Sequence, residues 1–71
     1  MDAKQLKKIV GFEIYRRRHD MGVPQWKLAE LLGTSQSTVS HWERRDWLPE
    51  TILLYRLADV FGCTVDELLG R

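Results

Sequence analysis

The stretch that decides the fold is residues 25–45, QWKLAELLGTSQSTVSHWERR, in a chain of 71 residues. Its first half carries apolar side chains at the spacing of one helix face: Leu28, Ala29 and Leu32. We therefore predict a short amphipathic helix over 25–32. Pro24 suits the first turn of this helix, because the backbone N–H that proline lacks has no partner there.

A short turn separates this helix from the next one. Gly33 stands where a left-handed residue costs least, and Ser35 is a favourable N-cap. We expect the next helix to run from Gln36 to about Arg44. The two predicted helices are thus joined by a three-residue turn, residues 33–35.

The predicted helix 36–44 has two different sides on a helical wheel. Val39 and Trp42 form the apolar side, which must face the core. The polar side holds Gln36, Ser37, Ser40, His41 and Arg44. Solvated helix faces favour Glu, Lys and Arg, whereas these short or amide-bearing groups let a helix enter a groove and bond to base edges. The alternative is a polar face with no function, since polar surface needs none.

Helical patterns also cover the rest of the chain, and no strand pattern appears. We predict a first helix over 3–20 that ends before Gly22, and a fourth over 51–61 that begins after Pro49. Thr64 and Glu67 have the spacing of a capping box, which opens a last short helix through Leu69. The fold class is therefore all-α, with five helices in one domain over 1–71.

Composition narrows the classes of protein. The chain is 44% hydrophobic and 30% charged, as in ordinary globular domains, and no apolar run approaches the roughly 20 residues of a membrane span. We see no export signal and expect a cytoplasmic protein.

A single cysteine, Cys63, permits no disulfide within the chain and no zinc site of several thiolates, and His19 and His41 lack metal-ligand spacing. We expect no metal, no cofactor and no small-molecule ligand.

The net charge of +1 conceals an uneven distribution. Residues 1–45 carry nine Lys or Arg and five Asp or Glu, a net +4, whereas residues 46–71 carry two and five, a net −3. A basic part and an acidic part fit a protein that offers one face to phosphates. Charge that serves only solubility is the alternative.

The sequence resembles the lambda-repressor/Cro-like, or XRE, family along nearly its whole length. The residues that carry the resemblance are QWKLAELLG at 25–33, SQSTVSHWER at 35–44 and Pro49, with Arg18 upstream and Leu57-Ala58, Phe61-Gly62 and Val65–Leu68 downstream. The resemblance implies a compact five-helix DNA-binding domain whose helices 2 and 3 form a helix-turn-helix over about 25–44.

The resemblance also implies roles for single residues. Gln25 corresponds to a glutamine that contacts phosphate and supports Gln36. Arg18 and Glu43 correspond to a structural salt bridge that ties the first helix to the third. Gln36, Ser37 and His41, with Ser40 nearby, correspond to residues that contact bases. Arg44 corresponds to a residue that contacts the DNA backbone. The full set of candidate DNA-binding residues is Gln25, Ser35, Gln36, Ser37, Thr38, Ser40, His41, Arg44 and Arg45.

Several residues depart from the family pattern. Arg45 stands where the family commonly has glycine, so a positive φ there would be strained. Pro24 replaces the usual small polar cap. Trp26 and Trp47 are expected to be exposed, and each could pack on the DNA backbone, join a dimer contact or cover the edge of the core; we favour edge packing for Trp26. Trp42 is expected in the core.

We therefore expect a sequence-specific transcription regulator of bacterial or phage type, and a repressor in particular. Basic side chains would supply salt-sensitive affinity and helix 36–44 the specificity. Since one domain reads only a few base pairs, we expect a two-fold homodimer on a palindromic operator in double-stranded DNA, with half-sites about 34 Å apart. Family members often dimerise through C-terminal helices, here Val60, Cys63, Val65, Leu68 and Leu69. The alternative is that these residues only close a small core.

Two other classes of function compete with this one. A protein-interaction module of the same fold, such as an antitoxin or coactivator domain, would bind a protein partner in place of DNA. An enzyme is the weakest alternative, because no nucleophile–base pair, phosphate-binding loop or carboxylate pair can be argued from the residues.

Overall fold

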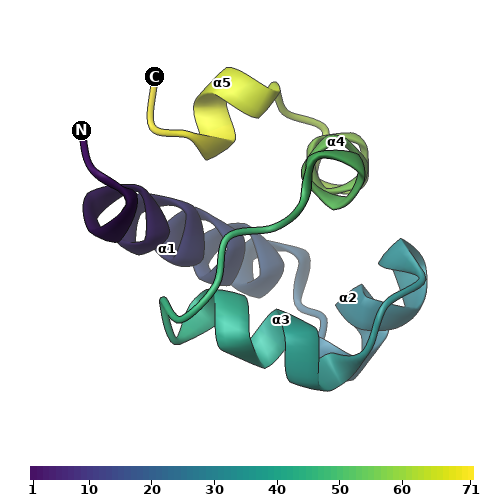
Figure 1. The fold of residues 1–71 in the computed structure, drawn as a ribbon. Helices are drawn as coiled ribbons and strands as arrows, with labels where there is room; N and C mark the ends of the chain where they lie inside the picture. The colour runs from purple at the N-terminus through teal and green to yellow at the C-terminus, as the bar shows by residue number, and fades with distance from the viewer.

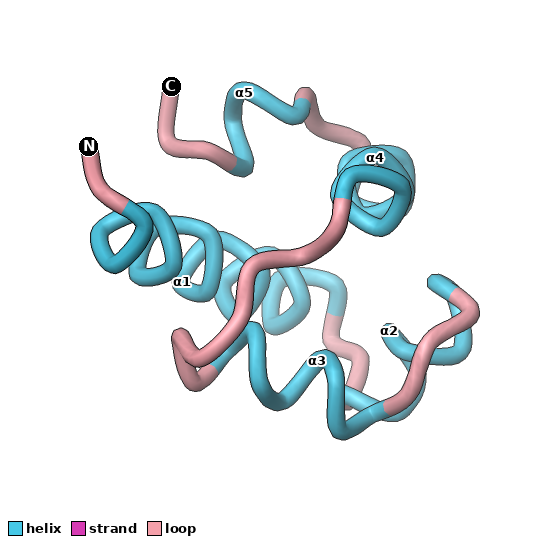
Figure 2. Tube along the Cα trace, in the orientation of Figure 1, coloured by secondary structure: helices cyan, strands magenta, loops and turns pink.

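In a computed structural model that describes residues 1–71, the chain forms five α-helices joined by short loops (Figures 1 and 2). They are α1 (Ala3–Met21), α2 (Gln25–Leu32), α3 (Gln36–Glu43), α4 (Thr51–Phe61) and α5 (Val65–Leu68). The predicted all-α class and all five helices are confirmed. Helix ends differ from the predicted ones by at most one residue, since fraying ends are where local signals are weakest.

The helices begin and end mostly at the residues that the sequence indicates. Asp2 caps α1 by accepting a hydrogen bond from the Gln5 N–H at 2.8 Å. Left-handed Gly22 ends this helix, as expected. Pro24 is in the N-cap position, one residue before the predicted first turn, with φ −77° and ψ 167°. The proline therefore ends the connection from α1 and does not itself enter the helix.

α1 runs between two pairs of helices (Figure 1). α3 lies against one side of it, α4 and α5 pack on the other, and α2 packs against both α3 and α4; the two chain ends lie near each other. One cluster of buried apolar side chains fills the space between them. Its members are Val10, Ile14, Leu28, Ala29, Leu32, Val39, Trp42, Leu57, Ala58 and Leu68.

Leu68 corrects one sequence-based expectation. Its exposed fraction is 0%, so it is a core residue and cannot line a dimer surface. The other residues expected there, Val60, Cys63, Val65 and Leu69, are partly buried and pack against the core. A core this small needs a contribution from every helix, and Leu68 is the residue by which α5 makes it.

α1 and α3 approach each other closely at Gly11. A Cβ atom there would lie 2.5 Å from the backbone oxygen of Trp42 and 3.3 Å from Cγ of Arg45. Glycine is required at this position because any side chain would push the two helices apart. This contact fixes the carboxyl end of α3 against α1.

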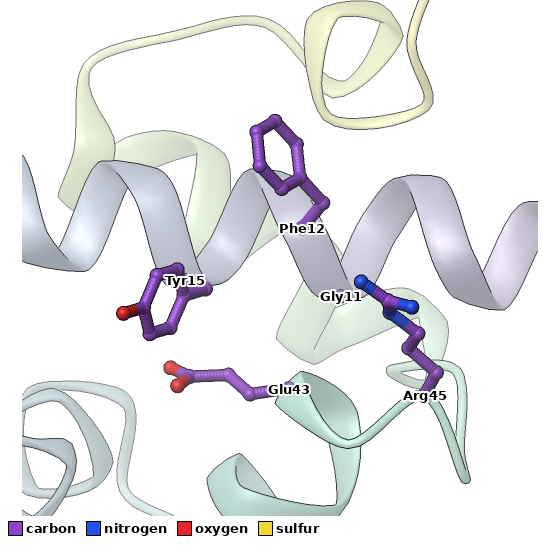
Figure 3. A pocket seen from close by; sticks show the side chains of 5 residues that line it. All are labelled: Gly11, Phe12, Tyr15, Glu43 and Arg45. Carbon is purple, nitrogen blue, oxygen red and sulfur yellow. The ribbon is translucent and has the colours of Figure 1, made fainter.

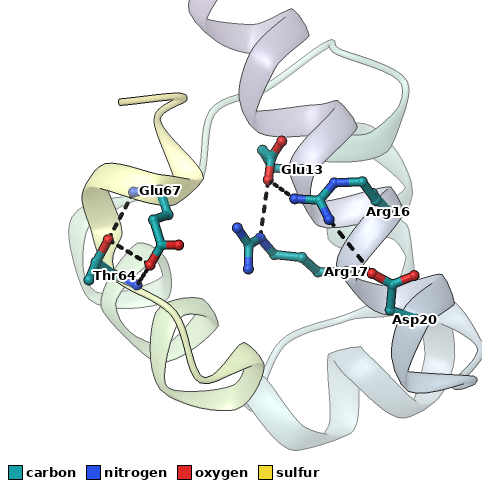
Figure 4. A network of polar contacts seen from close by, with 6 residues as sticks. All are labelled: Glu13, Arg16, Arg17, Asp20, Thr64 and Glu67. Atoms are coloured by element: carbon teal, nitrogen blue, oxygen red, sulfur yellow. Dashed lines mark hydrogen bonds and ion pairs between the residues drawn. The ribbon is translucent and has the colours of Figure 1, made fainter.

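Two separate groups of polar contacts lie on α1 and at the start of α5 (Figure 4). Glu13 accepts hydrogen bonds from Arg16 at 2.6 Å and Arg17 at 3.1 Å. Glu67 accepts from the Thr64 N–H at 3.0 Å, and the Glu67 N–H donates to Thr64 Oγ1 at 3.0 Å. The predicted capping box is therefore confirmed. The bond from the Thr64 backbone holds the pKa of Glu67 below its ordinary value.

None of the five helices combines the length and the apolar character that crossing a membrane would demand.

Candidate nucleic-acid interface

The turn between α2 and α3 holds these helices at a fixed angle. Gly33 adopts φ 72°, and the Thr34 N–H donates to the Ala29 carbonyl at 3.0 Å. Ser35 caps α3 by accepting from the Thr38 N–H at 3.1 Å, and the two hydroxyls lie 2.9 Å apart. The predicted three-residue turn and its N-cap are both confirmed. The Ser35 and Thr38 side chains hold the amino end of α3, and their contact with DNA stays a prediction.

The two sides of α3 face opposite environments. Val39 and Trp42 are buried, with 0% and 1% exposed. Gln36 and Ser37 are exposed, Ser40 is half-buried, and 59% of the Arg44 side chain is exposed. The division predicted from the helical wheel is confirmed. It gives the molecule a rigid helix whose outward side carries an amide, hydroxyls and a guanidinium.

Arg18 and Glu43 form the expected salt bridge. Arg18 Nε lies 2.7 Å from Glu43 Oε2 and Nη2 lies 3.0 Å from Oε1, so the pair is bidentate. Arg18 also donates to the Val23 carbonyl at 2.9 Å. The Glu43 hydrogen bond holds the pKa of Arg18 above its ordinary value. This arginine therefore joins three segments: α1, α3 and the loop that precedes α2.

Gln25 differs from its expected contact. Its side-chain amide donates to Glu43 Oε1 at 3.1 Å, and its expected hydrogen bond to Gln36 is absent. The reason is that Glu43, held by Arg18, offers a carboxylate at the start of α2, and hydrogen bonds to charged acceptors are the stronger ones. Gln25 thereby fastens α2 to the carboxyl end of α3.

The end of α3 is a left-handed cap without glycine. Arg45 has φ 68°, its N–H donates to the Trp42 carbonyl at 3.0 Å, and the Asp46 N–H donates to the His41 carbonyl at 3.0 Å. These two bonds are those of a Schellman motif, in which glycine usually takes the left-handed position. The positive φ that the family pattern associates with glycine is therefore present here in an arginine.

The Arg45 side chain extends along α1. It lines a hollow together with Gly11, Phe12, Tyr15 and Glu43 (Figure 3). Its aliphatic part covers Gly11, where α1 and α3 approach each other closely. Arg45 thus packs beside α1 in addition to ending α3.

His41 lies in a cluster that includes two residues from the following loop. Its ring stacks on Trp47, with 3.8 Å between the ring centroids and 19° between the planes. Its Nδ1 lies 3.0 Å from Asp46 Oδ2 and 3.2 Å from Arg44 Nη2. Sequence reasoning gave Asp46 no role and left the role of Trp47 open. The left-handed turn at Arg45 brings Asp46 and Trp47 back to His41. The departure from the family's glycine at Arg45 was the only feature of the sequence that drew attention to this turn.

Trp26 and Trp47 are both exposed, as expected. No group of three or more His, Cys, Asp or Glu side chains is arranged to hold a metal ion.

Comparison with known proteins identifies this architecture. A Helix-turn-helix family model matches residues 14–68. Among solved structures, the P22 c2 repressor in complex with a synthetic operator is similar, with a TM-score of 0.80 and 30% sequence identity. The match covers 83% of this chain and 89% of the repressor chain. No curated protein sequence matches the chain.

The chain belongs to the lambda-repressor-like (XRE) helix-turn-helix family. The resemblance found in its sequence is confirmed, and the class that this family defines is that of sequence-specific DNA-binding transcription regulators.

Proposed function

We propose that this protein regulates transcription, as a repressor, by placing α3 in the major groove of an operator. The observation that carries the proposal is the outward side of α3, where the side chains of Gln36, Ser37 and Ser40 make no intramolecular hydrogen bond while Val39 and Trp42 are buried. A helix fits the major groove, and glutamine and serine bond there to base edges. The likeness to a repressor described on its operator supports the same use of the fold.

Phosphate binding would flank this helix. Arg44, at the carboxyl end of α3, is the exposed cation nearest to the reading residues. Ser35 and Thr38 at the amino end, Gln25 at the start of α2 and Arg45 beside α1 complete the proposed set. Such contacts set the register of the protein on DNA and make the affinity depend on salt. A protein with this role would act in the cytoplasm, where bacterial or phage DNA lies.

The test separates base reading from phosphate binding. A motif is first selected from a random duplex pool, and affinities for the motif and for a scrambled duplex are then measured over a salt series. We expect Gln36→Ala to cost about 1–3 kcal/mol on the motif alone, and Arg44→Ala to weaken both duplexes and flatten the salt slope. Arg71→Ala, at the far chain end, is the control. Equal losses on both duplexes for Gln36→Ala would contradict the reading role.

We further propose that two copies bind one palindromic operator. Val60, Cys63, Val65 and Leu69 are the partly buried residues around α5 that a partner could cover, Leu68 being excluded by its burial. A palindrome with half-sites about one helical turn apart is expected from the selection experiment. Sedimentation of the protein with one selected duplex should show two copies for each duplex, and one copy would contradict the proposal.

A protein-interaction module is the second candidate. It is favoured by Ile52 and Tyr55, large apolar side chains that both lie exposed on α4. Affinity for DNA that stays in the non-specific range for every duplex would favour this candidate over the regulator.

A further inference from the structure

The cluster at the carboxyl end of α3 gives His41 a definite hydrogen-bonding direction. We propose that Asp46 and Trp47 hold His41 as the neutral tautomer protonated on Nδ1, so that its Nε2 accepts a hydrogen bond from the amino group of an adenine or a cytosine in the major groove. This inference rests on the proposed function, because it concerns which base the same helix reads.

The tautomer follows from what the two charged neighbours can donate or accept. An ionised aspartate only accepts hydrogen bonds, and an arginine only donates them. Asp46 Oδ2 lies 3.0 Å from Nδ1, so this nitrogen must carry the proton. Arg44 Nη2 lies 3.2 Å from Nδ1 and 3.4 Å from Nε2, and once Nδ1 carries the proton only Nε2 can accept from it. The neutral ring protonated on Nδ1 donates to Asp46 and keeps one lone pair, at Nε2, as an acceptor for Arg44.

Each other form of the ring conflicts with one neighbour. A neutral ring protonated on Nε2 would turn the Nδ1 lone pair toward the Asp46 carboxylate. A doubly protonated ring would satisfy Asp46 but would leave Arg44 no acceptor and place a second positive charge beside its guanidinium, whose Nη2 lies 3.2 and 3.4 Å from the ring nitrogens. Asp46 and Arg44 are the only charged groups within ion-pair or hydrogen-bonding distance of the His41 nitrogens. The hydrogen bond at one ring nitrogen therefore sets the state of the other.

Trp47 restricts how the ring can turn. The two rings lie nearly parallel, with centroids 3.8 Å apart. Rotation of the imidazole away from this plane would lose the stacking contact, and a half-turn would place a ring carbon against Asp46 in place of Nδ1. Asp46 and Trp47 are thus positioning residues, which act on DNA through His41.

Arg44 is the partner that can leave when DNA arrives. More than half of its side chain is exposed, at 59%, and its contacts are long: Nη2 lies 3.2 and 3.4 Å from the His41 nitrogens, and Nε lies 3.7 Å from Asp46 Oδ2. A phosphate is a charged acceptor and forms a stronger bond with a guanidinium than a neutral imidazole does. Moving Arg44 to a phosphate frees the Nε2 lone pair on the outward side of α3.

A free lone pair selects among bases. In the major groove the donors are the amino groups of adenine N6 and cytosine N4, whereas guanine N7 and O6 and thymine O4 are acceptors. An unprotonated Nε2 bonds to the first two and faces lone pairs on the others. His41 held in this way discriminates A and C from G and T at one operator position on the strand that it faces.

The tautomer can be measured on the free protein without DNA. Two-bond nitrogen–proton NMR correlations of 15N-labelled protein distinguish a ring protonated on Nδ1, on Nε2 or on both nitrogens. We expect His41 to show a protonated Nδ1 in the wild type and to lose this preference in Asp46→Ala. His19 serves as the reference within the same spectrum. A wild-type His41 protonated on Nε2 would overturn the proposal.

Selection from a random duplex pool tests the reading of the base. We expect the wild type to select A or C at one position of each half-site, and Asp46→Ala to reduce that preference by about fivefold, the value of one hydrogen bond. Asp46→Asn should largely retain it, since an amide oxygen still accepts from Nδ1. Glu50→Ala, which removes a nearby exposed carboxylate, should change nothing.

The outcomes separate this inference from the proposed function. If the wild type selects no motif, the regulator proposal fails and the base reading fails with it. If the wild type selects a motif whose bases are all unchanged in Asp46→Ala, the regulator proposal stands and the inference is overturned. Asp46→Ala should keep the wild-type Tm and the wild-type preference at the operator positions that depend on Gln36. This result shows that the variant is folded and that only the operator position read by His41 has changed.

Discussion

A single residue, Arg45, decides how the chain leaves the recognition helix. Its φ of 68° lies in the left-handed region, which costs residues with a Cβ roughly 1–2 kcal/mol. The two hydrogen bonds of the Schellman motif and the packing of the side chain over Gly11 offset this cost. The conformation persists because the surrounding structure requires it, as is usual for strained residues near functional sites.

Replacing Arg45 by glycine should therefore stabilise the protein. We expect Arg45→Gly to raise the free energy of unfolding by roughly 0.5–1 kcal/mol, because glycine adopts positive φ without steric cost. Urea denaturation measures the change. Arg44→Gly is the matched control and should be destabilising, because Arg44 has φ −81° in the right-handed region. A loss of stability in Arg45→Gly would show that side-chain packing over α1 outweighs the strain.

At the scale of helices, one buried ion pair joins three segments. The Arg18 and Glu43 side chains are only 11% and 6% exposed, and Gln25 bonds to the same carboxylate. Such a pair contributes little compared with apolar residues of the same shape, but removing one partner leaves the other charge buried and unpaired. The angle between α1 and the helix-turn-helix therefore depends on both residues.

Removing the arginine should lower stability, with little effect on base preference. We expect Arg18→Ala to cost about 3 kcal/mol and to lower Tm by roughly 10 °C or more. Arg16→Ala is the control, since Arg16 is exposed and its pairs with Glu13 and Asp20 should contribute less than about 1 kcal/mol. Thermal melting followed by circular dichroism measures both, and equal Tm values would contradict the structural role of Arg18.

The capping box of α5 should make stability depend on pH at the acid end. Because Glu67 has a lowered pKa in the folded state, its contribution is present above the pKa of an unfolded glutamate, about 4.3, and is lost as pH falls through the lower folded value. Glu67→Gln keeps an acceptor but cannot titrate. The difference in Tm between the wild type and this variant should shrink from pH 6 to pH 3. A difference that stays constant would refute the contribution of ionised Glu67 to stability.

At the scale of the whole molecule, ten buried apolar side chains form one contiguous core. A domain of this size hides only about 60% of its unfolded surface, so every element must contribute. α5, although it is a single turn long, contributes Leu68. The last helix is thus needed to complete the monomer before any partner is considered.

Truncating Leu68 should destabilise the monomer itself. We expect Leu68→Ala to cost about 2–5 kcal/mol, with a midpoint of urea denaturation that does not change with protein concentration. Leu69→Ala, at a half-buried position next to it, should cost less. A midpoint for Leu68→Ala that rises with protein concentration, or a smaller cost than that of Leu69→Ala, would contradict the core assignment.

Local features were predictable because their signals are local. The periodicity of Leu28, Ala29 and Leu32, the cap at Ser35 and the capping box at Thr64 depend on residues a few positions apart. Together with similar patterns over 3–20 and 51–61, they place every helix within one residue. The polar side of α3 follows from the same periodicity. The Arg18–Glu43 pair came from the family resemblance, since nothing in its spacing of 25 residues indicates contact.

The sequence by itself determined the five helices, the turn between α2 and α3 and the outward side of α3. Only the tertiary structure decided that Leu68 is buried, that Gln25 bonds to Glu43, and that Asp46 and Trp47 return to His41. Helix signals act within a turn or two of the chain, whereas these contacts depend on how helices pack and on the left-handed turn at Arg45. Packing selects among side chains that local patterns treat as equivalent.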